Sequence, residues 1–270
     1  MKKRIIITLQ YIFLTIISLI SIFPFVWMII GMTNDAVSIS TGKMTFGNQL
    51  AKNMSTLFND FNMAHILRDS IIITVITVIG ILIITSMSAY GFQMYQSKSK
   101  ERVYGFFLAT MMVPFASLMI PLFKIIANLK LINTYFAVII VAITSVFMIF
   151  FFRQSFEFYP VDVLQAARID GASELEVFLK IFVPSMKSTY FAAAIYSFIT
   201  SWNSYLWPLV VLQDNSKKTT TLLISTMSSS YTPDYGAIMC AIVISTLPII
   251  IIFFAFQKQF VQGMMGSVKQ

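Results

Sequence analysis

The residue types that usually perform chemistry are nearly absent from this chain. It has one histidine, His65, and one cysteine, Cys240, so it cannot assemble a histidine–cysteine zinc cluster or an internal disulfide, and the pattern of a Ser-His-Asp triad is missing. Its only Gly-Lys pair, Gly42-Lys43, lacks the upstream glycine and the following hydroxyl of a phosphate-binding P-loop. We therefore expect no catalytic residue, no metal site and no bound cofactor on this chain.

A polar and regularly built segment occupies residues 161–187, between two apolar blocks. Asp162 is a good helix N-cap, and Gln165 follows three residues later, as in a capping box. The pattern predicts a short helix over residues 163–169. Gly171 then predicts a break, because glycine readily adopts a positive φ.

A second helix is predicted directly after this break. Ser173 and Glu176 form another capping-box pair, and Pro184 is expected to end or kink the helix. Its apolar side chains are Leu175, Phe178, Leu179 and Phe182. From these residues alone, two interpretations are open: a helical elbow that fits another protein, or two amphipathic helices that lie in the lipid headgroup layer.

A second polar pattern lies in the stretch "IYSFITSWNSYLWPLV". On one continuous helix, Tyr196, Thr200, Asn203 and Trp207 would share a stripe. A sugar offers apolar ring faces and hydroxyl groups, so this stripe is a candidate substrate pathway. The alternative is that the hydroxyls pack helix against helix and the aromatic rings lie at the membrane interface.

The composition requires a membrane around these segments. Hydrophobic residues make up 57% of the 270 residues and charged residues only 11%, with a mean hydropathy of +0.81. These values lie outside the range of soluble domains. Because lipid-exposed backbone must satisfy its own hydrogen bonds, we expect transmembrane helices. The six candidate spans are residues 5–30, 70–92, 103–126, 133–152, 189–212 and 235–256.

The cationic residues predict the orientation of these spans. With the N-terminus inside, 12 of the 19 Lys and Arg side chains fall on the cytoplasmic side. This assigns the net charge of +8 to membrane topology rather than to nucleic acid, and both termini to the cytoplasm. The loops at 33–68 and 213–234 would lie outside, and the tail at 262–270 is predicted to be too polar and glycine-containing to extend the last helix.

The order of residues in the polar segment carries a family resemblance. "QAARIDGA", followed by Ile181 and Pro184, resembles the EAA loop of carbohydrate-type ABC importer permeases. The stretches "SAYGFQMY", "MVPFASLMIPLFKIIANLKLINTY", "TSWNSYLWPLVVL" and "FQKQFVQGMMGSVK" are similar to further motifs of this family. The chain departs from the pattern at Gln165, where the family usually has a glutamate that contacts the ATPase.

The resemblance implies a type I importer permease: an all-α membrane protein with six transmembrane helices and a cytoplasmic coupling helix between the fourth and fifth. Residues 1–69 would form an N-terminal transmembrane helix and extracytoplasmic loop, and residues 70–270 a five-helix core with the EAA-type loop at 153–188. The residues implied in ATPase coupling are Gln165, Ala166, Ala167, Asp170, Gly171 and Ala172.

The resemblance also implies partners and a location. They are a second permease subunit in a heterodimer, two cytoplasmic ATPase subunits that bind ATP and magnesium, and an extracytoplasmic solute-binding protein, all at the bacterial cytoplasmic membrane. The solute would be a sugar or oligosaccharide. A glycerol-phosphate-type solute is the alternative within the family. A secondary transporter is a weaker alternative, because it would need ionisable residues at mid-membrane, which the predicted spans almost lack.

Overall fold

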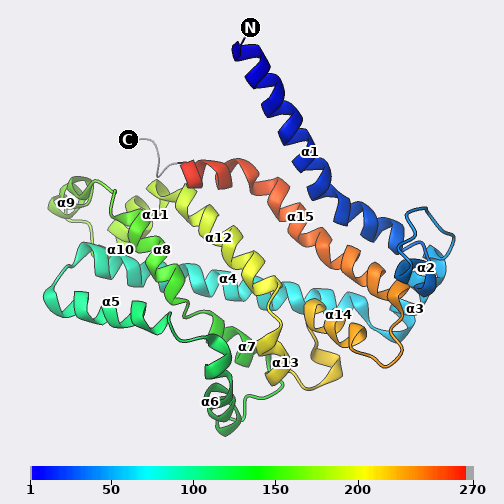
Figure 1. Cartoon of the computed structure of the whole chain (residues 1–270). Helices are drawn as coiled ribbons and strands as arrows, with labels where there is room; N and C mark the ends of the chain where they lie inside the picture. Colours follow the sequence, from blue (N-terminus) through cyan, green and yellow to red (C-terminus); the bar gives the residue numbers. More distant parts are fainter. Residues whose placement is uncertain (1, 266–270) are drawn as a thin grey trace. The chain divides into compact units, whose positions relative to one another are not determined.

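The structure is a computed structural model that describes residues 2–265 of the chain, and the side chains of residues 3–257. Over the described residues the chain is helical and contains no β-strand, which confirms the all-α class (Figure 1). In chain order the helices are α1 (Lys2–Gly31), α2 (Ala36–Ser40), α3 (Leu50–Asp60), α4 (Met63–Met94), α5 (Lys98–Thr110), α6 (Phe115–Asn128), α7 (Tyr135–Ala142), α8 (Val146–Phe156), α9 (Val161–Ile169), α10 (Glu174–Glu176), the π-helix η1 (Val177–Phe182), α11 (Val183–Ser185), α12 (Lys187–Trp202), α13 (Leu206–Val211), the 3-10 helix η2 (Asn215–Lys217), α14 (Thr220–Ser228) and α15 (Tyr235–Met265).

The helices form two compact units. The first comprises Met1–His65 and Leu223–Leu247, and the second comprises Ile66–Leu222 and Pro248–Gln270. The second unit contains the whole polar segment that the sequence singled out, and it therefore holds the candidate site.

Hydrogen bonds from the buried Asn53 side chain fix the segment that follows α1 in the first unit. The side-chain nitrogen of Asn53 donates to the carbonyl oxygens of Met32 and Asn34, both at 2.9 Å. Gly236 at the start of α15 is required here, because a Cβ at this position would lie 2.5 Å from the Asn53 amide. By contrast, the most apolar stretch of α1 has no buried side chain.

Three helices of the described residues are long and apolar enough to cross a membrane singly, namely α1, α4 and α15. Two further candidates are bent pairs, so the count rises to five if each pair is one span. The predicted number of six therefore requires the α12–α13 pair as an additional span.

The third predicted span, over residues 103–126, is not one helix. The chain breaks between Thr110 and Phe115, and α5 and α6 meet at 103°. Pro114 explains the break, because its ring disfavours a helical conformation at the preceding residue and it has no N–H to donate. The fourth span bends more gently, by 41° between α7 and α8, where Ser145 caps the new helix.

The fifth predicted span, over residues 189–212, is also wrong as a continuous helix. α12 ends at Trp202 and α13 begins at Leu206. Pro208 occupies the first turn of α13, where a helix tolerates a missing N–H, whereas in the middle of one long helix its ring would clash with the carbonyl four residues earlier.

The predicted end of the last helix is wrong as well. α15 continues through residues 262–265, although Gly263 lies in this stretch. A glycine costs about 1 kcal/mol relative to alanine, and a long helix absorbs that cost because extending it requires no new nucleation. The rest of the predicted polar tail, residues 266–270, lies outside the described residues.

Candidate functional site

The short helix α9 starts two residues earlier than the sequence predicted. Pro160 is its N-cap, with an extended backbone, and Val161 is already helical. Asp162 therefore lies inside the first turn and accepts no capping hydrogen bond, so the predicted capping box between Asp162 and Gln165 is wrong. Proline has a fixed φ compatible with the start of a helix, and the helix begins directly after it.

The C-terminal end of α9 confirms the predicted glycine break. Gly171 has a φ of 87°, and no atom outside its chain neighbours lies within 4 Å of the position of its absent Cβ. Its N–H donates to the Arg168 carbonyl at 3.1 Å, and the Ala172 N–H donates to the Ala167 carbonyl at 3.1 Å. These two bonds form a Schellman motif, which satisfies the last carbonyls of the helix and turns the chain.

The second capping box is present as predicted. The Glu176 N–H donates to Ser173 Oγ at 3.4 Å, and the Ser173 N–H donates to Glu176 Oε2 at 3.1 Å. Lys180 Nζ donates to the same carboxylate at 2.9 Å. The hydrogen bond from Lys180, followed by those from Ser173, lowers the pKa of Glu176 to about 2, so the capping group is ionised at neutral pH.

The helix after the capping box is a π-helix over most of its length. The Val183 N–H reaches back to the Phe178 carbonyl, five residues earlier. Pro184 accounts for the wider turn, because in an α-helix its ring would press on the carbonyl of Lys180. The predicted apolar side chains separate into two sets, with Phe178 and Phe182 buried and the two leucines exposed.

An aromatic cluster anchors α9 and η1 to the rest of the second unit. Leu164 is the one fully buried side chain of α9 and packs into this cluster. The Phe182 ring lies at its centre, with centroids 4.6 Å from Phe156, 4.8 Å from Tyr159 and 4.9 Å from Tyr90. We call the segment from α9 to α11 the elbow. Because Tyr90 belongs to α4 and Phe156 to α8, the elbow rests on both helices (Figure 1).

A polar contact that the sequence did not indicate joins α9 to the end of α4. Arg168 donates to both carboxylate oxygens of Glu174, at 2.6 and 3.2 Å, and its guanidinium lies 5.7 Å from the Tyr95 ring centroid. The hydrogen bonds with Glu174 raise the pKa of Arg168, and those with Arg168 lower the pKa of Glu174. The only signal in the sequence is an aromatic residue at the start of the polar stretch "YQSKSKER".

A second arginine, Arg153, joins the end of α8 to α5 just before the elbow begins. Arg153, near the end of α8, pairs with Glu101 at 2.6 Å and lies 4.0 Å above the Tyr104 ring. Both partners belong to α5. The C-terminal end of α8, from which the elbow emerges, is thus held to the first turns of α5.

The predicted coupling residues present a largely accessible surface. Gln165 and Ala166 are exposed on α9, as are Asp170 and Gly171 at its end. The other two, Ala167 and Ala172, are partly buried against the aromatic cluster. Because the side chains of this surface are mostly small, the backbone of another protein has room to approach α9 closely.

The predicted pathway residues do not share one helix. Tyr196 is 45% exposed on α12, with its ring centroid 5.0 Å from that of Phe147, and Thr200 and Asn203 are exposed. Trp207 is different, because it lies on α13, is buried, and donates from Nε1 to the Ala137 carbonyl at 2.9 Å. The helix break at Asn203 thus removes Trp207 from the predicted stripe.

Two residues of the loop before α7 adopt a left-handed backbone. Lys130 has a φ of 57° and Asn133 a φ of 60°. The Asn133 side-chain oxygen accepts from the backbone N–H groups of Gln213 and Asp214, at 2.6 and 3.0 Å, and the Asn133 N–H donates to the Val211 carbonyl at 2.8 Å. This clamp joins the loop between α6 and α7 to the segment that follows α13.

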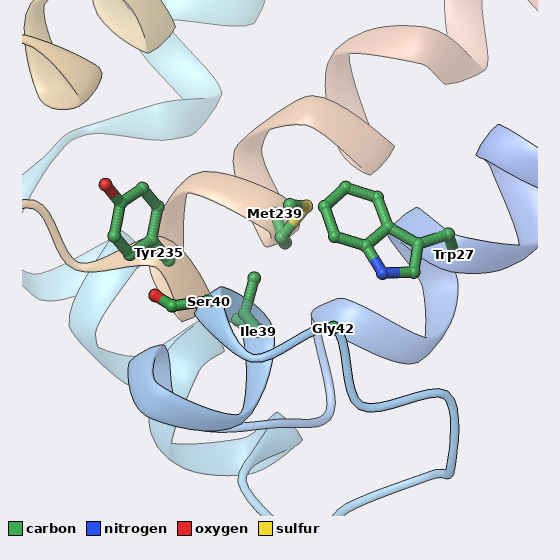
Figure 2. A pocket seen from close by; sticks show the side chains of 6 residues that line it. All are labelled: Trp27, Ile39, Ser40, Gly42, Tyr235 and Met239. Carbon is green, nitrogen blue, oxygen red and sulfur yellow. The ribbon is translucent and has the colours of Figure 1, made fainter.

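The first unit has an open groove of about 520 Å³, shown in Figure 2. Trp27 of α1 and Met239 of α15 lie on one side of it, and Ser40 and Tyr235 on the other. No charged side chain lines the groove. It has few polar groups with which to hold a hydroxyl-rich solute, so the elbow and the exposed residues of α12 remain the principal candidate sites.

Comparison with protein families and curated proteins gives consistent matches. The family described as "Binding-protein-dependent transport system inner membrane component" matches residues 80–266. The lactose transport system permease protein LacG of Rhizobium radiobacter is 44% identical, over 100% of this chain and 98% of the relative. The arabinooligosaccharides transport system permease protein AraQ of Halalkalibacterium halodurans is 35% identical, over 94% of this chain and 93% of the relative.

A more distant relative and a solved structure extend these matches. The sn-glycerol-3-phosphate transport system permease protein UgpE of Salmonella typhi is 28% identical, over 92% of each chain. The fold is similar to a chain in the crystal structure of a bacterial ABC transporter involved in the import of the acidic polysaccharide alginate. The TM-score is 0.83 at 21% identity, over 95% of this chain and 97% of that chain.

Proposed function

The chain belongs to the family of binding-protein-dependent transport system inner membrane components, and on this premise we propose that it is a permease subunit of an ATP-driven importer for a neutral oligosaccharide. The observation that carries the substrate class is the 44% identity to a lactose permease over the whole chain. The chain is a multi-pass membrane protein of this family.

The proposed topology has six spans, with α12 and α13 together as the fifth and both termini in the cytoplasm. The EAA-type loop at 153–188 then faces the cytoplasm, and α9 is the coupling helix. The organisation into an N-terminal helix with its loop (1–69) and a five-helix core (70–270) belongs to the same proposal. The distribution of Lys and Arg supports it.

The proposed assembly contains four kinds of subunit. This chain pairs with a second permease, and two cytoplasmic ATPase subunits bind ATP and magnesium. An extracytoplasmic protein delivers the sugar, and the outer loops at 33–68 and 213–234 are its proposed docking region. The catalytic chemistry takes place on the ATPase subunits.

Coupling follows from how α9 is anchored. The residues proposed to contact the ATPase are Gln165, Ala166, Ala167, Asp170, Gly171 and Ala172. When the ATPase subunits close on ATP, α9 would move with them. Leu164 and Phe182 would transfer this motion to α4 and α8 through the aromatic cluster, and η1 continues through α11 into α12. The result would be a switch of the pore between inward-open and outward-open states.

The proposed substrate pathway uses Tyr196, Thr200 and Asn203. An aromatic face, a hydroxyl and an amide suit a neutral sugar, and all three side chains are accessible on α12 or at its end. Trp207 acts in this proposal as the buried support for α13 rather than as a contact. A glycerol phosphate is the alternative, favoured by the UgpE relatives, but these three residues offer no cation for a phosphate.

Uptake by the complete transporter in proteoliposomes tests the substrate class. We expect ATP-dependent accumulation of lactose or of an arabino-oligosaccharide, and none of glycerol 3-phosphate. Asn203→Ala should slow sugar uptake about tenfold while ATPase activity stimulated by the binding protein persists, since an interaction of about 1.4 kcal/mol is lost at the pore. Preferred uptake of glycerol 3-phosphate would overturn the assignment.

A further inference from the structure

The charge of α9 differs from that of the chain as a whole. The chain has a net charge of +8, yet the two exposed ionisable side chains on the free surface of α9 and its C-cap are acids, Asp162 and Asp170. The single cation of this helix, Arg168, is turned back toward Glu174 and is 29% exposed. Its charge is neutralised behind the helix, so the outward surface is acidic.

Helix geometry places this surface opposite the buried anchor. At about 100° per residue, Asp162, Ala166 and Ile169 point away from Leu164, and Gln165 lies at the edge of the same surface. Ile169 is 86% exposed, and Leu164 is fully buried. The nine residues from Asp162 to Asp170 span about 12 Å along the axis. The outward surface thus has an acid at each end, with the small side chain of Ala166 and the exposed side chain of Ile169 between them.

Asp162 lies in the first turn of α9, where an acid is favourable to the helix dipole, but the fold itself explains neither the exposed isoleucine nor the acid at the C-terminal end. Among the described residues, Asp162 caps no backbone N–H and forms no ion pair. Asp170 lies at the C-terminal end of the helix, where a negative charge opposes the helix dipole. An anionic headgroup layer would repel both carboxylates. The surface therefore suits a basic protein groove better than a lipid surface.

We propose that the outward surface of α9 docks into a groove of the ATPase that has a cation at each end and an apolar socket for Ile169. Asp162 supplies, one helical turn earlier, the negative charge that Gln165 lacks. This inference rests on the proposed function, because it assigns the partner of α9 as the ATPase. It adds which side chains carry the contact and which chemistry the groove must have.

Moving the charge along the helix tests the role of Asp162. In the complete transporter, Asp162→Asn should lower ATP-dependent uptake and stimulated ATPase activity about tenfold, with a steeper loss at high salt. The double change Asp162→Asn with Gln165→Glu should restore most of both, because it returns an acid to the same surface. Gln165→Glu alone should give no gain. The matched control is Glu157→Gln, an exposed acid outside α9, which should leave both unchanged.

A purely structural role of Asp162 predicts a different result. If the carboxylate only stabilised the first turn, moving the acid to position 165 would not rescue uptake, and the effect would be independent of the ATPase. Wild-type behaviour of Asp162→Asn, or no rescue by the double variant, would overturn this inference.

A second variant, Ala166→Trp, distinguishes a failure of this inference from a failure of the proposed function. A bulky side chain at the centre of the surface should prevent the ATPase from co-purifying with the permease. If Ala166→Trp blocks assembly while Asp162→Asn is silent, α9 is the docking helix and the charge assignment fails. If Ala166→Trp assembles normally, α9 is not the ATPase contact and the proposed function itself fails.

Discussion

Single backbone positions determine the shape of the elbow, and Gly171 is the clearest of them. Its φ of 87° lies where an L side chain is strained, although the space around it is empty. Gly171→Ala should therefore destabilise the turn by about 1–2 kcal/mol, and Gly171→Asn by less, because asparagine tolerates a left-handed backbone. Faster hydrogen exchange at the N–H groups of residues 171 and 172 would report the loss of the Schellman bonds. If asparagine were more harmful than alanine, the space above Gly171 would be filled by a partner in the assembled transporter.

Lys130 occupies the equivalent position after α6 without being glycine. The Lys130 N–H donates to the Ala127 carbonyl at 2.9 Å, and the Leu131 N–H donates to Ile126 at 3.0 Å, so the same motif is closed by a lysine at a φ of 57°. Lys130→Gly should remove this strain and stabilise the protein by about 0.5–1 kcal/mol, after allowing for the greater freedom of glycine in the unfolded chain. A rise in the thermal midpoint of the purified protein would show the gain. Lys130→Ala is the control, because it keeps the Cβ and should give no rise.

Features of the elbow that depend on neighbouring residues could be predicted from the sequence, whereas contacts between distant residues could not. Gly171 and the Ser173–Glu176 box follow from short-range rules, and the structure confirms both. The residue type of Asp162 predicts a helix cap, but α9 begins earlier, directly after Pro160. The contact of Arg168 with Tyr95 could not be predicted, because the two residues are far apart in the sequence and meet only when the elbow packs on α4.

The contact between Arg168 and Tyr95 is a second connection between α9 and the spans, in addition to the covalent path through η1. Exposed cation–π and ion pairs are each worth about 0.5–1 kcal/mol, so neither is expected to determine folding. We expect Arg168→Gln or Tyr95→Leu to lower the sugar transported per ATP hydrolysed, with the double variant no worse than either single variant. The ratio of uptake to ATPase activity measures this. Additive losses would mean that the two side chains act separately. Lys180→Gln, which removes an exposed ion pair between η1 and α10, is the control that should leave the ratio unchanged.

The three long apolar helices were easier to predict than the continuity of the other spans. The predicted spans at 5–30, 70–92 and 235–256 each lie within one long helix, whereas the other three stretches are divided. The breaks at Pro114 and before Pro208 follow rules that are known from sequence, but a proline in a membrane helix is often accommodated without a break. Whether the chain bends at such a residue depends on packing, as with Trp207, whose indole reaches the Ala137 carbonyl. The prediction that Trp207 shares a stripe with Tyr196, Thr200 and Asn203 is wrong for the same reason, because the chain bends between α12 and α13.

The number of spans decides which side of the membrane each segment faces. Each bent pair either crosses the membrane or returns to the side from which it entered, and the 103° angle between α5 and α6 makes that pair the critical one. If this pair crosses and α12–α13 crosses as well, six spans place the termini on one side and the elbow in the cytoplasm. If it returns, every later segment changes side, and α9 would lie on the opposite side of the membrane from the proposed location.

Cysteine labelling in intact cells distinguishes these two topologies. Gln96 and Leu129 lie just outside the two ends of the α5–α6 pair and are exposed, and Cys240 can be replaced by alanine to give a background without cysteine. A crossing pair predicts that an impermeant thiol reagent labels Leu129→Cys but not Gln96→Cys, because six spans with a cytoplasmic N-terminus place residue 129 outside. In cells without the ATPase subunits, Ala166→Cys should then be protected until the cells are opened. Labelling of both Gln96→Cys and Leu129→Cys, or of neither, would show a re-entrant pair, and labelling of Ala166→Cys in intact cells would remove α9 from the ATPase side.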